Sequence, residues 1–288
     1  MDANTQQGAQ QQHAAKPSLF SNKKVLYGAI LVLIIAVVIA LVLTNGSGNA
    51  GSQLAVFDGQ PVPQAIISQL AVPNSVAASV KTGFASNFPK PVNGTALVVN
   101  GKPEVLYMGA EYCPYCAIER WGLIIALMRF GNFTGIEYMT SSATDSFANT
   151  PTFTFVNSTY SSPYISFVPV EMVNNKINPS TGQYSPLQHP NSSEQAILSK
   201  YNPVGSIPFI DFANSAVQIG ANYNDPTILD GRNWSTIAAS ANDPTSTISM
   251  AVVGAANIAT AQICMLTNNT PASVCGQSYI STIETELG

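Results

Sequence analysis

Two cysteines three positions apart, Cys113 and Cys116, are the residues of this chain best suited to chemistry. They follow the apolar run 105–108 and open a segment with helical periodicity, so the sequence predicts a buried strand, a short turn and a helix. A thiolate at a helix N-terminus is stabilised by free backbone N–H groups and by the helix dipole, which lower its pKa. We therefore expect Cys113 to be an exposed nucleophile with Cys116 within its reach.

The neighbours of the pair bear on its chemistry. Pro114 suits the first turn of a helix, because the N–H that it lacks has no helical partner there. With Tyr115 it completes the sequence Cys-Pro-Tyr-Cys. Glu111 and Glu119 would raise the pKa of a nearby thiol and Arg120 would lower it, and the sequence does not give the balance.

Other interpretations of the pair stay open. It could be a structural disulfide, two core cysteines spaced by chance, or half of a metal site. A zinc site needs further Cys or His ligands, whereas the chain has four Cys and two His, with His13 in the N-terminal tail and His189 in a polar loop. We expect no metal, and no cofactor besides the redox-active disulfide itself.

Residues 105–129 resemble the active-site strand, CxxC turn and helix of the thioredoxin superfamily, in the Cys-Pro-Tyr-Cys form found in glutaredoxins. A second segment, residues 205–212, has an Ile207-Pro208 step that opens an apolar strand. In that superfamily the corresponding proline is cis and packs against the dithiol, so the resemblance implies a cis Pro208 beside Cys113. The alternative is a proline at the first position of an edge strand.

An apolar run near the N-terminus predicts a membrane anchor. Residues 25–43 are 19 residues without a charge, enough for a helix that crosses a bilayer. Three lysines precede the run and no Lys or Arg follows it before Lys81, which places the N-terminus in the cytoplasm and the rest outside. A cleaved signal peptide is the alternative, although the apolar run is longer than is usual for one.

The chain beyond the anchor is also similar, over most of its length, to an uncharacterised family of membrane-anchored, thioredoxin-like proteins of thermoacidophilic archaea. That resemblance names no substrate. The expected organisation is a disordered cytoplasmic tail over 1–24, a transmembrane helix over 25–44, a linker over 45–60, and an extracytoplasmic thioredoxin-like domain over 61–288 with an insertion at about 145–203.

The periodicity beyond residue 60 predicts the α/β class: a central mixed sheet flanked by helices, with an inserted β-hairpin and loop region. Expected helices are one or two over 63–80, the CxxC helix, 227–239 and 246–266. Expected strands are 95–99 and 104–108, joined by an Asn100-Gly101 turn; 136–139, completing a parallel βαβ unit; 152–156 and 164–170, forming the inserted hairpin; one opened by Pro208; and 215–219.

Residues 174–193 predict a long loop rich in Asn, Pro, Ser and Gly. A loop of that length inside a compact domain is usually functional or disordered. The insertion is therefore the candidate region for contact with a partner near the dithiol.

The other two cysteines, Cys264 and Cys275, enclose ten residues. Outside the cytoplasm an even number of cysteines favours pairing. A disulfide closing such a loop contributes roughly 3 kcal/mol in the chain-entropy model. We expect a structural disulfide between two helices, and the alternative is a second dithiol that passes electrons to the first.

The composition limits the possible partners. Only 9% of residues are charged, the net charge is −4, and there is no basic cluster. We therefore do not expect the chain to bind nucleic acid, which requires a positively charged surface. A surface of neutral polar groups suits an acidic exterior. Seven glycosylation sequons that fit an exterior glycoprotein follow the apolar run, at Asn45, Asn93, Asn132, Asn157, Asn191, Asn233 and Asn268.

These features predict a single-pass membrane protein that exchanges thiols and disulfides with extracytoplasmic proteins. Cys113 would form a mixed disulfide and Cys116 would resolve it. A membrane redox partner must recycle the dithiol, and oxidation, isomerisation and reduction all stay open. The buried acid of thioredoxins has no counterpart in residues 95–99, so the proton acceptor stays open too. The alternative function is a non-catalytic, surface-anchored binding module.

Overall fold

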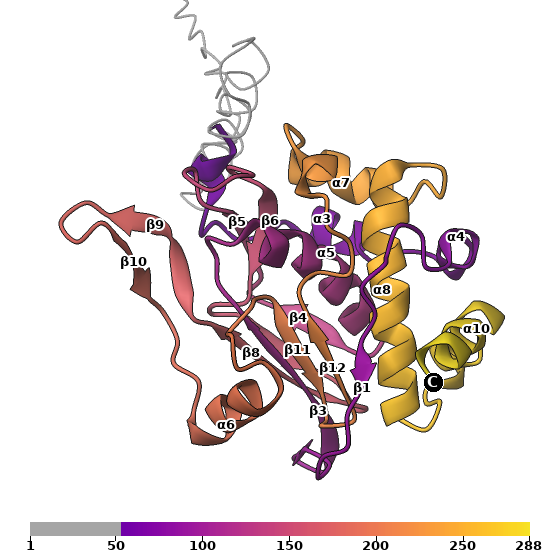
Figure 1. The fold of residues 1–288 in the computed structure, drawn as a ribbon. Coiled ribbons are helices and arrows are strands. Elements are labelled where there is room, and N and C mark those ends of the chain that lie inside the picture. Colours follow the sequence, from indigo (N-terminus) through magenta and orange to yellow (C-terminus); the bar gives the residue numbers. More distant parts are fainter. Residues whose placement is uncertain (1–52) are drawn as a thin grey trace, which may run out of the picture. The chain divides into compact units, whose positions relative to one another are not determined.

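The computed structural model describes residues 53–288 (Figure 1). The expected tail, the transmembrane helix and the first half of the linker, residues 45–52, lie outside the described residues. The packed chain begins before residue 61, because Leu54 is buried in the core and the 3-10 helix η1 (Ala55–Phe57) follows it. Within residues 53–288 one helix, α8 (Thr247–Leu266), is long and apolar enough to cross a membrane, but 89% of that apolar stretch is buried, as in a core helix.

A mixed sheet forms the centre of the fold, as the sequence predicts. Strand β3 pairs in parallel with β8 on one side and antiparallel with β11 on the other, and β11 continues through β12 to β1. The strands are β1 (Lys90–Pro91), β2 (Val98–Val99), β3 (Lys102–Gly109), β8 (Ser166–Glu171), β11 (Phe209–Phe212) and β12 (Ala216–Ile219).

Helices cover both faces of this sheet. The core strand β3 is apolar in both directions, as a strand between two layers must be. Val105 and Tyr107 face the larger core with helices α5 (Pro114–Met128) and α8, whereas Leu106 and Met108 face a smaller one with α6 (Ser192–Tyr201). Figure 1 shows α8 running beside α5, with α10 (Ser278–Leu287) on its outer side.

The close approach of α5 and α8 depends on Gly122. A Cβ there would lie 2.7 Å from the Cβ of Ala255 in α8. Two helices form over 63–80, in agreement with the expectation of one or two, and Pro73 separates them. The expected helix over 227–239 is divided in two, and Asn233 caps the start of its second part. The remaining helices are α3 (Gln64–Gln69), α4 (Asn74–Val80), η2 (Pro226–Leu229), α7 (Trp234–Ala241), α9 (Ala272–Cys275) and α10 (Ser278–Leu287).

The region between α5 and β8 differs from the expectation. Strand β5 (Glu137–Thr140) does not complete a parallel unit with β3; it pairs antiparallel with β6 (Pro151–Thr154) outside the central sheet. The expected hairpin of 152–156 with 164–170 is also wrong, because β8 takes the parallel place beside β3. Strand β6 instead covers α5, where Phe153 packs on Trp121 at 4.5 Å between ring centroids.

The expected loop over 174–193 is wrong as well. It contains a hairpin of β9 (Val173–Asn178) and β10 (Gln183–Pro186), turning at Gly182 with a positive φ of 68°. The hairpin extends away from the sheet at the left of Figure 1. Strand β9 has only two apolar residues, Val173 and Ile177, with Asn175 between them on the same face, so its apolar alternation is weak. A further two-stranded sheet pairs β4 (Asn132–Thr134) with β7 (Thr159–Ser161).

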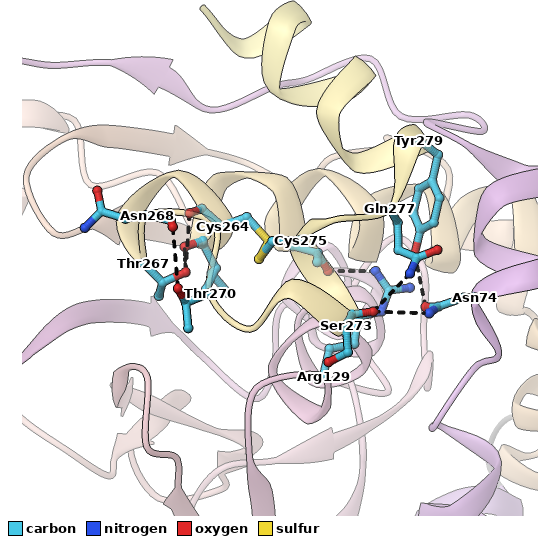
Figure 2. The surroundings of a disulfide bond; sticks show 12 residues. Asn74, Arg129, Cys264, Thr267, Asn268, Thr270, Ser273, Cys275, Gln277 and Tyr279 are labelled. Carbon is cyan, nitrogen blue, oxygen red and sulfur yellow. Dashed lines mark hydrogen bonds between the residues drawn. A yellow bond between two sulfur atoms is a disulfide. The ribbon is translucent and has the colours of Figure 1, made fainter.

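A disulfide joins Cys264, in the last turn of α8, to Cys275 at the end of α9, with a Cα–Cα distance of 5.5 Å (Figure 2). This is the pairing expected from the sequence. Next to it, the amide of Asn74 donates to the carbonyl of Ser273 at 3.5 Å, so α4 is tied to the same corner. The disulfide therefore lies within a packed corner of helices, away from the CxxC turn of α5.

Candidate functional site

The CxxC pair lies at the start of α5. Cys113 is the N-cap residue, and its Sγ accepts a hydrogen bond from the backbone N–H of Cys116 at 3.3 Å. Pro114 occupies the first helical position, where it sacrifices no helical hydrogen bond. Both cysteines are free thiols. The strand, the turn and the helix thus place the two sulfurs together at a helix N-terminus.

The two sulfurs differ in their environment. The expectation of an exposed Cys113 is wrong, because Cys113 is only 5% exposed and Cys116 is fully buried. A hydrogen bond from the Cys116 thiol lowers the pKa of Cys113 below its ordinary value, and the charge of Arg120 adds to this effect. Burial raises the pKa of Cys116 well above its ordinary value. Of the two thiols, Cys113 therefore ionises more readily than Cys116.

The cis proline lies at the same edge of the sheet. The Ile207-Pro208 peptide bond is cis, as the resemblance implied. Phe209 pairs with Met108, so Pro208 lies beside the end of β3, where the chain turns towards Cys113. The N–H of Gly220 donates to the Pro208 carbonyl at 2.8 Å, which fixes this segment from the side of β12.

Arg120 forms a buried ion pair that the sequence did not predict. Its Nε and Nη2 donate to the two carboxylate oxygens of Glu171, at 2.8 and 2.7 Å, and Nη2 also donates to the Ala110 carbonyl at 2.9 Å. Both side chains are fully buried. Glu171 ends β8 and pairs with Gly109, so assigning residues 164–170 to the central sheet would have brought Glu171 to the site.

The two expected flanking acids have different partners. Glu111 is buried and accepts a hydrogen bond from the Thr154 hydroxyl at 2.6 Å, and burial raises its pKa. Glu119 accepts from the backbone N–H of Asn222 at 2.8 Å, beyond β12, and burial raises its pKa to about 7. Glu119 therefore connects α5 to the segment after β12, in which Gly220 donates to the Pro208 carbonyl.

Two inserted segments border the CxxC turn. The ring of Tyr112 stacks on Tyr184 of β10 with 4.5 Å between centroids and 7° between planes. The Tyr184 hydroxyl donates to Ser142 at 2.8 Å, and the N–H of Ser142 donates to the Tyr112 carbonyl at 2.9 Å. Tyr115 packs edge-on against Phe147 at 5.9 Å. The insertion, which the sequence predicts as the region of contact with a partner, thus contacts the residues next to both cysteines.

We expect Tyr184→Ala to speed alkylation of Cys113 several-fold, because it removes the ring stacked on the residue next to that cysteine. The measurement is the rate of iodoacetamide labelling of the reduced protein at fixed pH. Tyr184→Phe is the matched control, since it keeps the ring and removes only the hydroxyl. Equal rates for Tyr184→Ala and the wild type would mean that the hairpin does not limit access to Cys113.

Residues 89–199 match the model of a family described as a domain of unknown function (DUF929). The match includes the CxxC pair, α5 and β8 with Glu171, and it ends before Pro208. No curated protein and no solved structure matches the chain. Within residues 53–288 no group of three or more His, Cys, Asp or Glu side chains is arranged to hold a metal ion.

Proposed function

We propose that this chain is a membrane-anchored thiol–disulfide oxidoreductase that acts outside the cytoplasm on the disulfides or thiols of other proteins. The observation that carries this proposal is the position of Cys113: its sulfur caps α5 and accepts the N–H of Cys116 at 3.3 Å. The hydrogen bond from the Cys116 thiol and the charge of Arg120 lower its pKa. A sulfur held in this way is the attacking atom of thiol–disulfide exchange.

The surrounding topology supports a thioredoxin-like fold. Strand β3, helix α5 and the parallel strand β8 form a βαβ unit whose helix begins at the CxxC pair, the context in which this motif is redox-active. The cis Pro208 opens β11 directly beside the end of β3. In this fold the backbone at Pro208 would hold an extended segment of the substrate across the dithiol.

The proposed chemistry is two-step exchange. The Cys113 thiolate attacks a substrate disulfide, forms a mixed disulfide and releases one substrate thiolate. Cys116 then attacks the Cys113 sulfur and releases the second substrate sulfur, which takes up the proton that Cys116 loses. Oxidation of a substrate dithiol is the same pair of steps in reverse. The dithiol itself is the redox group, so this chemistry needs no further cofactor.

The proposal includes the location and the partners. A helix over 25–44 would anchor the protein in the lipid with residues 45–288 outside, where protein thiols and disulfides are the substrates. A membrane redox partner would recycle the dithiol. The low fraction of charged residues suits an acidic exterior of the kind that thermoacidophilic archaea face, and the sequons suit a glycoprotein.

The test is catalysed exchange by the full chain in detergent, with a fluorescent peptide as substrate in its disulfide and its dithiol forms. We expect the wild type to accelerate exchange and Cys113→Ser to lower the rate to that of buffer. Cys113→Ser is a small change of one atom at the cap, so circular dichroism should be unchanged. Equal rates for both proteins would contradict the proposal.

A second function, a non-catalytic binding module, is favoured by the burial of both sulfurs and by the extended β9–β10 hairpin. In that case Cys113 and Cys116 would form an inert structural disulfide. Alkylation after treatment with a mild reductant distinguishes the two functions. In an enzyme the reductant opens the disulfide and Cys113 is then alkylated, whereas a structural disulfide with a potential below about −300 mV is not reduced by the glutathione pool.

A further inference from the structure

The buried ion pair beneath the CxxC turn gives the proposed exchange a direction. We propose that Arg120, held in place by Glu171, is the fixed positive charge that stabilises the ionised sulfur of the reduced dithiol and makes the Cys113–Cys116 disulfide an oxidant. The substrates would then be reduced proteins with free thiol pairs, which receive the disulfide. This inference rests on the proposed function and deepens it.

The helix brings Arg120 under the dithiol. It follows Cys116 by four residues and Cys113 by seven, so all three lie along one face of α5. Side chains on a helix tilt towards its N-terminus. The hydrogen bond from Nη2 to the Ala110 carbonyl, 2.9 Å long, carries the guanidinium back past the first turn of the helix. The charge is therefore located at the level of the sulfurs.

Glu171 keeps the guanidinium in that position. Two hydrogen bonds of 2.8 and 2.7 Å join Nε and Nη2 to its carboxylate, and both side chains are fully buried. Glu171 itself is fixed by the pairing of β8 with β3, where it lies opposite Gly109. A bidentate pair between a helix and a sheet fixes the orientation of the guanidinium as well as its distance from the carboxylate. Glu171 is thus a positioning residue that acts through Arg120.

Two buried donors at this site have no partner among residues 53–288: Nη1 of Arg120 and the hydroxyl of Tyr107. The Tyr107 ring lies 5.8 Å from the guanidinium, and a Cβ on Gly109 would come within 2.1 Å of the Tyr107 hydroxyl. Buried donors without partners are costly. An anion beside them would offset this free energy of desolvation by accepting from the two donors. The ionised sulfur of the dithiol is the anion that the reaction supplies.

The charges around the sulfurs agree with this assignment. Arg120 lowers the pKa of both cysteines, although burial dominates at Cys116 and raises its pKa. The other titratable groups that face the site are Tyr107, Glu111, Tyr112 and Glu171. In the mixed disulfide Cys113 carries no charge, so the resolving Cys116 must carry it, in a fully buried position. A fixed cation is what that step requires.

A stabilised thiolate makes the disulfide more oxidising, because the reduced form gains free energy and the oxidised form does not. In the proposed direction, two substrate thiols lose two protons and two electrons and become a disulfide, while Cys113–Cys116 is reduced to the dithiol. The electrons then pass by a second exchange to a disulfide of a membrane partner protein. Each step exchanges one disulfide for another, so atoms and electrons balance.

The test compares two variants of the full chain that change the charge in opposite directions. Glu171→Gln leaves the cation uncompensated, so the pKa of Cys113 should fall and the equilibrium with glutathione should shift towards the reduced protein, by roughly tenfold or about 30 mV. Arg120→Met/Glu171→Leu removes both charges without leaving one unpaired, so both quantities should move the opposite way by a similar factor. Thiolate absorbance and redox titration measure them.

Arg129→Met is the matched control. Arg129, the C-cap residue of α5, is half-buried, with Nε and Nη2 inaccessible to solvent. Its Nη1 donates to the Thr260 hydroxyl at 2.7 Å, and it lies near the Cys264–Cys275 disulfide (Figure 2). It should change neither the pKa of Cys113 nor the potential. Shifts of Glu171→Gln and Arg120→Met/Glu171→Leu in the same direction, or no shift in either, would overturn the inference. The thiolate titration needs no substrate, so it is independent of whether the wild type catalyses exchange.

Discussion

Full-length protein with Cys116→Ser should accumulate mixed disulfides with its substrates in cells. Cys113 would still attack or be attacked. The residue that resolves the intermediate would no longer carry a sulfur, although its backbone N–H lies 3.3 Å from Cys113 Sγ. The adduct therefore persists until an external thiol removes it. The measurement is a non-reducing gel of alkylated cells, in which adducts of higher mass disappear on reduction.

The trapped partners identify the direction as well as the substrate. If the protein is an oxidant, the adducts should contain secreted proteins with unpaired thiols, and the membrane partner that recycles the dithiol. Cys113→Ser/Cys116→Ser is the control, because it retains Cys264 and Cys275 and should form no adduct. Adducts of equal amount in this control would mean that they form elsewhere than at Cys113.

We expect the folded protein to be more stable at pH 4 than at pH 7.5. Burial raises the pKa of Glu119 from 4.5 to about 7 and that of Asp211 from 3.8 to about 6. Folded-state values above the unfolded ones mean that the folded protein retains protons that the unfolded chain releases between about pH 4 and pH 7. The contribution of these two groups to the stability is therefore fully present below about pH 4 and is lost as the pH rises through this window.

The size of this effect is large for a protein of this length. One pKa unit corresponds to about 1.4 kcal/mol, so Glu119 and Asp211 together contribute a difference on the order of 5 kcal/mol. Burial also raises the pKa of Asp58, Glu104 and Glu111, with the same sign. Such a profile would suit a protein that works in an acidic exterior.

Denaturant unfolding of the full chain at several pH values measures the profile. Glu119→Gln is the informative variant, because an amide oxygen can still accept the N–H of Asn222 but carries no charge. It should raise the stability at pH 7.5 and flatten the profile between pH 5 and pH 7. A wild-type protein that loses stability on acidification from pH 7 to pH 5 would contradict the assignment.

The sequence predicted those elements whose apolar pattern is strong and local. The strand before Cys113, its helix and α8 all have long apolar runs, and the Asn100-Gly101 turn has positive φ angles of 52° and 76°, as such a hairpin requires. The CxxC pair was found because its chemistry depends on position within one helix. Local spacing was enough to place both sulfurs at the helix start.

The pairing of β8 could not be predicted in the same way. Its run 164–170 contains Pro169, which cannot donate a ladder hydrogen bond, and this favours a place at an edge, as in the expected inserted hairpin. In the structure Pro169 lies opposite Tyr107 in the parallel pairing. Which strand lies beside β3 is decided by packing between distant segments. The Arg120–Glu171 pair depends on that choice and was missed with it.

The burial of Cys113 was missed for a similar reason. The position at the head of the helix predicts an accessible sulfur if nothing else covers the turn. Here the Tyr112 side chain is stacked against Tyr184, 72 positions further along the chain, and Phe147 packs on Tyr115. Both contacts come from inserted segments whose polar sequences carry no clear periodicity.

The pH dependence of Cys113 alkylation in the reduced, full-length protein tests the central claim most directly. Labelling by iodoacetamide from pH 4 to pH 10, followed by mass spectrometry of the peptide that contains Cys113, gives its pKa. We predict reaction in the native state with a midpoint below the ordinary thiol value of 9.0. A Cys113 that reacts only after unfolding, or that titrates at or above 9.0, would contradict the account.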